Sequence, residues 1–532
     1  EDAEGNTVSA SMINAEDVGG KTFTLLPGNY TVTEIKAPSD GSYRINCQPQ
    51  LVTINSGSNK NVNELDYIET TWVKITKESS NSDMTEDNGC YSLEGAEYTI
   101  YKEDGVTVAD YITEKDDSGK IISMAKAENL VTNADGEISV LDLPILDVPV
   151  LELPLGTYYV KETKASKGYQ LDTCNEGTTS KMHSVTLEEP GKTYSVTCKE
   201  VPVNDSINIA IVKWDKETNR SSALGKASLE NALFEVKYYD GYYTDIDKLP
   251  EGATRTWVIQ TLYNNENKAY MAMLDDEHKV SGDEFYTSNN NVSLPLGTVT
   301  VEEIQAPEGY KLLTDGGAIF DANGKIDSGI FIGQVKENAA APSGASLYVG
   351  EKIQETIITG NPLTTTAISV YEPLVRMDLA FTKLDYETRK EMAGIPFKIT
   401  SVTTGESHIV VTDSAGYYST NTSHAGHGEN TNANDKYLSQ NLTSYDDCVE
   451  TGIWFYGTAN QAEWDASLID ETKGALPYDT YVIEELPCRK SQEKQLELAE
   501  KVVIEPEDDG KIKNIGIITN ILEPQITTCA RD

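Results

Sequence analysis

A phrase centred on one glutamate recurs four times along the chain and constrains its fold more than any other feature. Three copies read "YTVTEIKAPSDGSY" (30–43), "YYVKETKASKGYQ" (158–170) and "VEEIQAPEGY" (301–310), and the fourth reads "YVIEELPCRK" (481–490). The alternating Tyr, Val and Thr residues before each glutamate are typical of a strand. The copies lie at domain-sized intervals, which are too long for the unit of a solenoid. The chain is therefore predicted to repeat one kind of β domain.

A second phrase, centred on a lysine, precedes the last three glutamate phrases. Its copies read "VKITKES" (73–79), "IVKWDKET" (211–218) and "FTKLDYET" (381–388). Between lysine and glutamate lie a further strand pattern, such as "LEGAEYTIY" (93–101), and turns rich in Asp, Asn and Gly. Several short strands joined by such turns predict a β-sandwich.

With 532 residues, the chain is too long for a single hydrophobic core. We expect the C-terminal part of a first domain over 1–70, complete domains over 71–206, 207–376 and 377–523, and the start of a following repeat over 524–532. Proline at every fifth residue of "LDLPILDVPVLELPL" (141–155) predicts an extended loop there. The polar, aperiodic segment 421–448 predicts a long surface loop.

The charge balance argues against two classes of partner. Lys plus Arg number 43 and Asp plus Glu number 86, so the formal net charge of −43 repels nucleic acid and anionic lipid. The sequence contains no apolar run of about 18 residues, the length that would predict a membrane-spanning segment. We therefore expect no nucleic-acid binding and no membrane insertion within this segment.

Seven cysteines are spread along the chain without a CxxC or Cys/His spacing, so we expect neither a zinc site nor another metal or cofactor. Two intradomain disulfides are compatible with the sequence, Cys174 with Cys198 and Cys448 with Cys488. The odd count leaves one cysteine over, and the sequence alone does not determine the pairing.

Taken together, the lysine strand, the "GAEYTI" strand, the Asp-Gly turn and the glutamate phrase resemble the collagen-adhesin B-type, SpaA-like domains of Gram-positive surface proteins and pilins. The resemblance covers nearly the whole chain. It implies an all-β array of tandem transthyretin-like (prealbumin-like) sandwiches, displayed outside the cell and attached to the cell wall through regions outside this chain. The tail "EPQITTCARD" (523–532) resembles the first strand of another repeat found in such proteins.

The resemblance also implies an intramolecular isopeptide bond. Burial in an apolar core lowers the pKa of a lysine and raises that of a glutamate, so the neutral amine can attack an Asn carboxamide that the protonated glutamate polarises. In the last domain the three residues are Lys383, Glu485 and Asn520, the last of them in "GIITNILEP". The reaction occurs once and releases ammonia, so no enzyme with turnover is expected.

The other two complete domains depart from this pattern. Their pairs are Lys77 with Glu162 and Lys213 with Glu303. Tyr371 stands where the family has its Asn in one domain, and Glu200 lies near that position in the other. The sequence is compatible with a bond or with a buried ion pair in these domains. It is also compatible with lysines and glutamates on the exposed faces of strands.

Two functions of different classes follow from these patterns. One is a structural stalk in a cell-wall-displayed adhesin, stabilised by self-cross-linking. The alternative is direct binding of a host protein, such as mucin, collagen or immunoglobulin, through exposed faces of the domains. Its candidate patch is Tyr242 and Tyr243 in "YYDGYYTDIDK" (238–248), because exposed aromatic clusters mark binding surfaces.

Overall fold

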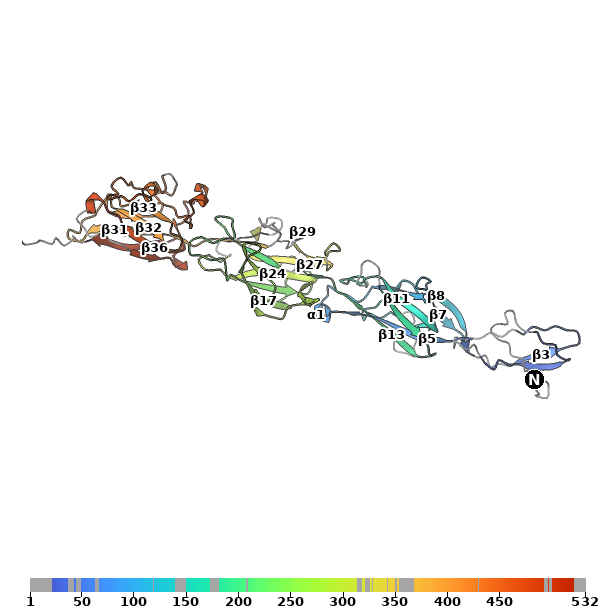
Figure 1. Cartoon of the computed structure of the whole chain (residues 1–532). Coiled ribbons are helices and arrows are strands. Elements are labelled where there is room, and N and C mark those ends of the chain that lie inside the picture. The colour runs from blue at the N-terminus through green and yellow to red at the C-terminus, as the bar shows by residue number, and fades with distance from the viewer. Residues whose placement is uncertain are drawn as a thin grey trace, which may run out of the picture. The chain divides into compact units, whose positions relative to one another are not determined.

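The computed structural model shows an all-β chain and so confirms the predicted fold class (Figure 1). It divides into two compact units, residues 1–203 and 204–532, which are described separately. The predicted boundaries of the individual repeats remain a prediction. The structure describes residues 22–36, 43–44, 49–62, 67–117, 119–138, 150–172, 181–206, 209–312, 318–320, 326–327, 329–341, 343–349, 352–353, 368–428, 430–491, 496 and 500–520.

The first unit begins with two short antiparallel strand pairs. These are β1 (Gly28–Val32) with β3 (Gln50–Ile54), and β2 (Tyr43–Arg44) with β4 (Tyr67–Ile68). Glu34, the first of the recurring glutamates, follows β1 and is half-buried.

The second repeat is a sandwich of two sheets. One sheet has the order β10 (Leu151–Pro154), β5 (Thr70–Ser79), β13 (Thr193–Glu200). The other has the order β12 (Met182–Leu187), β11 (Gly156–Lys164), β6 (Glu97–Lys102), β9 (Leu130–Val131). A hairpin of β7 (Asp110–Lys115) and β8 (Ile121–Lys126) and a short helix, α1 (Ser82–Thr85), complete it. Ile75 of β5, Tyr98 of β6 and Val160 of β11 belong to one buried cluster, so the core lies between the sheets.

The second unit begins with a larger sandwich. Its first sheet has the order β18 (Leu262–Asn264), β19 (Ala269–Met273), β15 (Ala210–Asp215), β30 (Ile368–Glu372), β25 (Ala318–Phe320), β26 (Ile326–Asp327). Its second has the order β20 (Lys279–Gly282), β17 (Arg255–Gln260), β16 (Leu233–Tyr239), β24 (Gly297–Gln305), β27 (Ile330–Glu337), β28 (Ala345–Val349), β29 (Lys352–Ile353). Smaller elements are β14 (Asn204–Asp205) with β23 (Leu294–Pro295), β21 (Thr287–Ser288) with β22 (Asn291–Val292), and the 3-10 helix η1 (Ile246–Lys248).

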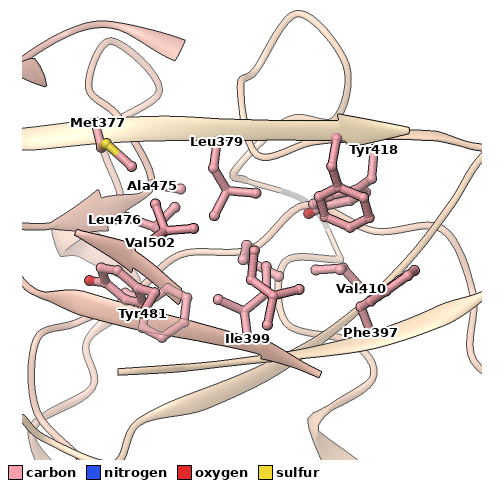
Figure 2. Close-up of a cluster of buried hydrophobic side chains, with 14 of the residues drawn as sticks. Met377, Leu379, Phe397, Ile399, Val410, Tyr418, Ala475, Leu476, Tyr481 and Val502 are labelled. Carbon is pink, nitrogen blue, oxygen red and sulfur yellow. The ribbon is translucent and has the colours of Figure 1, made fainter. Parts of the chain in front are cut away.

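The last sandwich also has two sheets. The first contains β34 (Tyr417–Ser419), β31 (Arg376–Asp385), β35 (Leu476–Pro477) and β38 (Ile512–Asn520), and the second has the order β33 (Ser407–Val411), β32 (Pro396–Ser401), β36 (Thr480–Glu485), β37 (Glu500–Val503). The 3-10 helices are η3 (Asp435–Tyr437), η4 (Gln461–Glu463), η5 (Ala466–Leu468), η6 (Arg489–Ser491) and η7 (Pro506–Asp508). Figure 2 shows Met377 and Leu379 of β31 directed toward the layer that carries Ile399 of β32.

Two local expectations need correction. The third copy of the proline-rich phrase forms strand β10, which pairs with β5 at the edge of the sheet, where Pro154 can end the strand. Residues 139–149 lie outside the described part. Segment 421–448 is not simply a surface loop, because His427 and Asn434 are fully buried and hydrogen-bonded to backbone carbonyls.

Candidate cross-linking sites

Each predicted lysine and glutamate meet in the core between the two sheets of their sandwich. In the second repeat, Lys77 of β5 lies with its Nζ 3.0 Å from Oε1 of Glu162 of β11, and both side chains are fully buried. Glu162 also accepts a hydrogen bond from the backbone N–H of Asp172, at 2.7 Å. The burial excludes the alternative that these residues occupy exposed strand faces.

In the third repeat, Lys213 of β15 forms ion pairs with two glutamates at once, Glu303 of β24 and Glu372 of β30. All three side chains are fully buried. The Nζ of Lys213 also lies 5.1 Å from the centre of the Phe234 ring in the opposite sheet. The centre therefore lies inside the core and contains two carboxyl groups for one amine.

In the fourth repeat, Lys383, Glu485 and Asn520 come together as the sequence predicts. The Nζ of Lys383 lies 2.9 Å from Oε2 of Glu485. The Nδ2 of Asn520 donates to both oxygens of the same carboxylate, at 3.0 and 3.1 Å. All three residues are buried, so one carboxyl group contacts both the amine and the carboxamide in an apolar environment.

The first and last strands of each complete sandwich pair in parallel, and their register identifies the third member of each centre. Asn520 lies opposite Asp385, two residues after Lys383. Glu200 lies opposite Ser79 and Glu372 lies opposite Asp215, again two residues after the lysine. Glu200, Glu372 and Asn520 therefore occupy equivalent positions.

This register corrects the assignment of Tyr371 to the Asn position. Successive residues of a strand point to opposite faces, so Tyr371 points away from Lys213 and its ring stacks on Trp214, with centroids 5.9 Å apart. Its neighbour Glu372 points into the core. The sequence did contain a signal for Glu372. By the alternation of faces along a strand, Glu372 and not Tyr371 shares the lysine's face of the sheet.

The pKa values of Glu200 and Glu372 are strongly perturbed. Burial raises the pKa of Glu200 to about 8, and the nearby Glu162 and Asp172 add to this effect, while Lys77 opposes it. The Oε1 of Glu200 accepts a hydrogen bond from the Tyr98 hydroxyl at 3.0 Å, and its Oε2 lies 3.6 Å from the Nζ of Lys77.

Glu372 behaves in the same way. Burial raises its pKa to about 8, with Lys213 opposing the shift and Glu303 adding to it. Burial therefore favours the protonated form of both glutamates.

Other predicted sites do not form centres of this kind. Tyr242 is exposed, but Tyr243 is only half-exposed and its N–H donates to the Thr298 hydroxyl. Cys448 and Cys488 are free cysteines, which corrects the second candidate disulfide, and Cys198 is free as well. Cys174 lies outside the described residues.

Within the described ranges, no group of three or more His, Cys, Asp or Glu side chains is arranged to hold a metal ion. No helix in the described part of the chain is long and apolar enough to cross a membrane.

These features define a class of protein: tandem β-sandwiches with a buried lysine–carboxyl centre in each complete repeat. Residues 73–201 match the family model of the SpaA prealbumin-like fold domain. The match confirms, over this part of the chain, the resemblance that the sequence motifs indicated. No curated protein sequence matches the chain.

Several solved structures resemble the chain. The TIE protein of Bacillus anthracis is 16% identical, with a TM-score of 0.41 over 90% of this chain and 54% of that one. BcpA, the major pilin subunit of Bacillus cereus, is 13% identical, with a TM-score of 0.25 over 86% of this chain and 100% of that one. The pilus adhesin SpaC of Lactobacillus rhamnosus GG is 13% identical, with a TM-score of 0.27 over 90% of this chain and 47% of that one. This chain spans about half the length of the TIE protein.

Proposed function

We propose that the chain is a stalk segment of a cell-wall-displayed adhesin or pilus protein, stabilised by an isopeptide bond between Lys383 and Asn520. The proposal rests on one observation: the buried carboxyl group of Glu485 contacts both the Lys383 amine and the Asn520 carboxamide. The protein would act outside the cell and would be attached to the wall through regions beyond this segment.

The chemistry follows from this arrangement. None of the described residues hydrogen-bonds to Oδ1 of Asn520, and a half-turn of the carboxamide would place that oxygen against Glu485. A proton on Glu485 would then polarise the carbonyl group. The neutral Nζ of Lys383 attacks Cγ, and Glu485 takes one proton from Nζ and gives one to Nδ2. The bond from Cγ to Nδ2 then breaks, and Nδ2 leaves as ammonia.

The position of the bond suits a segment that bears tension. β31 is the first strand of the last sandwich, β38 is its last strand, and the two run parallel. A bond from Lys383 to Asn520 would carry force from the first strand directly to the end of the last one. In the chain-entropy model, closing a loop of this length stabilises the fold by about 5 kcal/mol.

Intact mass under reducing and denaturing conditions tests the bond. The wild-type chain should be lighter than its sequence mass by at least one ammonia. Glu485→Gln should restore that ammonia and lower the thermal unfolding temperature, because Gln cannot donate a carboxyl proton. The matched control is Glu484→Gln, on the other face of β36 and paired with the half-exposed Lys398. An intact mass of the wild-type chain that shows no loss of ammonia would refute the cross-link.

Host-protein binding is the second candidate, and it requires a different measurement. The immobilised chain would be exposed to mucin, collagen and immunoglobulin, with Tyr242→Ser as the variant because Tyr242 is 43% exposed. Saturable capture that is lost in the variant would support a binding role for this segment. No capture would leave the stalk as its function.

A further inference from the structure

We propose that Glu200 and Glu372 are also cross-linking residues, and that they form isopeptide bonds to Lys77 and Lys213 with release of water instead of ammonia. This inference rests on the proposed self-cross-linking of the family scaffold. It differs in the chemical nature of the acceptor, which is a carboxylic acid one methylene longer than Asn.

The positions of the two glutamates in their strands support the inference. The parallel register places Glu200 and Glu372 two residues beyond the residue opposite their lysine, as it places Asn520. In each sandwich the acceptor position therefore lies on the last strand, on the face that carries the lysine of the neighbouring strand. A glutamate at this position presents a carbonyl carbon to the same amine.

Contact is the second argument. The Nζ of Lys77 lies 3.6 Å from Oε2 of Glu200, and Lys213 forms an ion pair directly with Glu372. All four side chains are fully buried. Within the described part of the chain, Oε2 of each acceptor glutamate has no hydrogen-bond partner, as is also true of Oδ1 of Asn520. A buried polar atom without a partner is rare and costly in a folded protein.

Charge is the third argument. Each lysine contacts two buried carboxyl groups, so full ionisation would leave one uncompensated negative charge in the core. Burying such a charge is expensive, and the centre avoids it by keeping one proton on a carboxyl group. The raised pKa values of Glu200 and Glu372 agree with that protonation. Proton transfer within the centre can then generate the reactive pair of neutral amine and carboxylic acid.

The reaction balances without an external reagent. The neutral Nζ attacks Cδ of the acceptor glutamate, and a bond from nitrogen to carbon forms. The second glutamate, Glu162 or Glu303, accepts a proton from the nitrogen and donates one to the departing hydroxyl group. The bond from Cδ to oxygen breaks, water leaves, and the product is a neutral amide. Fixed proximity replaces the bimolecular encounter that makes this condensation slow in water.

Intact mass distinguishes the two proposals, because each type of bond releases a different molecule. Loss of one ammonia and two waters would support both. Loss of ammonia alone would overturn the present inference and leave the stalk proposal intact. Loss of water alone would support the present inference and refute the bond to Asn520. An unchanged mass would refute both, and loss of one water would support one of the two centres and refute the other.

A peptide map of the wild-type chain locates the bonds independently of any variant. Trypsin cannot cleave after a lysine whose amine is acylated, and the tryptic peptide that begins at Glu200 also contains Lys213. We therefore expect one branched peptide that joins the β5 peptide, residues 200–216 and the β30 peptide, and that is lighter by two waters. Linear peptides that end at Lys77 and Lys213 with full yield would overturn the inference.

Variants then assign the roles. Glu372→Ala and Glu303→Gln should each restore one water to the intact mass, the first by removing the acceptor and the second by removing the proton shuttle. The matched control is Glu302→Gln, because this half-buried neighbour on β24 lies on the opposite face. The Glu302→Gln variant should still be lighter by the same number of waters as the wild type. A branched β15–β30 peptide from the Glu372→Ala variant would show that another residue is the acceptor.

Discussion

His408 is fully buried in the last sandwich between two carboxylates. Its Nδ1 lies 2.8 Å from Oδ2 of Asp435 and its Nε2 lies 3.1 Å from Oε1 of Glu406. Burial alone would lower the pKa of the imidazole, but the two carboxylates outweigh it and raise the pKa to about 9. The same Glu406 accepts the backbone N–H groups of Tyr456 and Gly457. The charged histidine therefore helps to fix the segment before β35 to the β32–β33 hairpin.

The raised pKa of His408 predicts a loss of stability at alkaline pH. The folded state binds the proton more tightly than the unfolded state, whose histidine has the ordinary pKa of 6.5. The stabilisation, about 3 kcal/mol, is fully present below about pH 6.5 and is lost as pH rises through about 9. Thermal unfolding measured from pH 6 to pH 10 should show the gap between the wild type and His408→Gln closing. Parallel curves would contradict the prediction.

At the scale of single residues, the sequence indicated the lysine–glutamate pairs but missed one of their partners. The repeated phrases identified each lysine that is buried in the described part of the chain, and its glutamate, because the alternation of strands places such residues on one face. Glu372 was missed because a shift of one residue in register moves a side chain to the other face of the sheet. His408 had no sequence signal, since its carboxylate partners come from separate segments, Glu406 from the turn between β32 and β33 and Asp435 from η3.

A glycine turn holds the lysine strand of the last sandwich at the point where Lys383 lies. Gly416 has a φ of +66°, and its carbonyl oxygen accepts the backbone N–H of Lys383 at 2.7 Å. A Cβ at this position would lie 2.6 Å from the carbonyl oxygen of Lys383. Gly136 occupies the corresponding turn beside Lys77, with a Cβ position 2.3 Å from that lysine's carbonyl oxygen.

We therefore expect Gly416→Ala to destabilise the last sandwich by more than the backbone conformation alone would cost. The left-handed conformation costs a residue with a side chain about 1–2 kcal/mol, and the contact with the Lys383 carbonyl adds to that. Gly405→Ala is the matched control, because Gly405 has a φ of +77° and nothing within 4 Å of its Cβ position. Chemical denaturation of both variants measures the difference. Equal losses would show that the close contact is unimportant.

At the scale of elements, strand patterns were predictable and irregular segments were not. The lysine and glutamate strands follow the alternation of apolar residues that a half-buried sheet requires. Segment 421–448 has no such period, because its buried residues are fixed by individual hydrogen bonds. Asn434, for example, donates to the carbonyl oxygens of Ile409 and Val449 and accepts the N–H of Val449. No periodic pattern reports contacts of this kind.

Within the second unit, a buried ion cluster connects the third and fourth sandwiches. Glu217, which follows β15, pairs with Arg376 at the start of β31, at 2.9 Å, and with Lys473, at 3.0 Å. The guanidinium also donates to the carbonyl oxygen of Phe455 and lies 4.0 Å from the Trp454 ring centre. Burial opposes the ionisation of Glu217, but the two cations outweigh it and lower its pKa.

No sequence pattern indicated this cluster, because its charges are far apart along the chain and belong to different repeats. A prediction of the individual sandwiches therefore leaves their junction undetermined. The junction also contains two backbone hydrogen bonds, from the N–H of Gly225 to the carbonyl oxygen of Gly457 and from the N–H of Lys226 to that of Tyr478. Their amide protons report directly on whether the two sandwiches stay together.

We expect Glu217→Gln to loosen this junction. The variant leaves the buried Arg376 without a carboxylate, and removing one partner of a buried ion pair costs about 3–5 kcal/mol. Hydrogen exchange at Gly225 and Lys226 should therefore accelerate. The control is Glu463→Gln, because the pair of Glu463 with Arg220 also joins the two sandwiches but is solvent-exposed, at 3.6 Å, and such pairs contribute about 1 kcal/mol or less. Unchanged exchange in Glu217→Gln would mean that the buried ion cluster does not hold the junction, whose stability would then rest on packing and on the backbone hydrogen bonds between the two sandwiches.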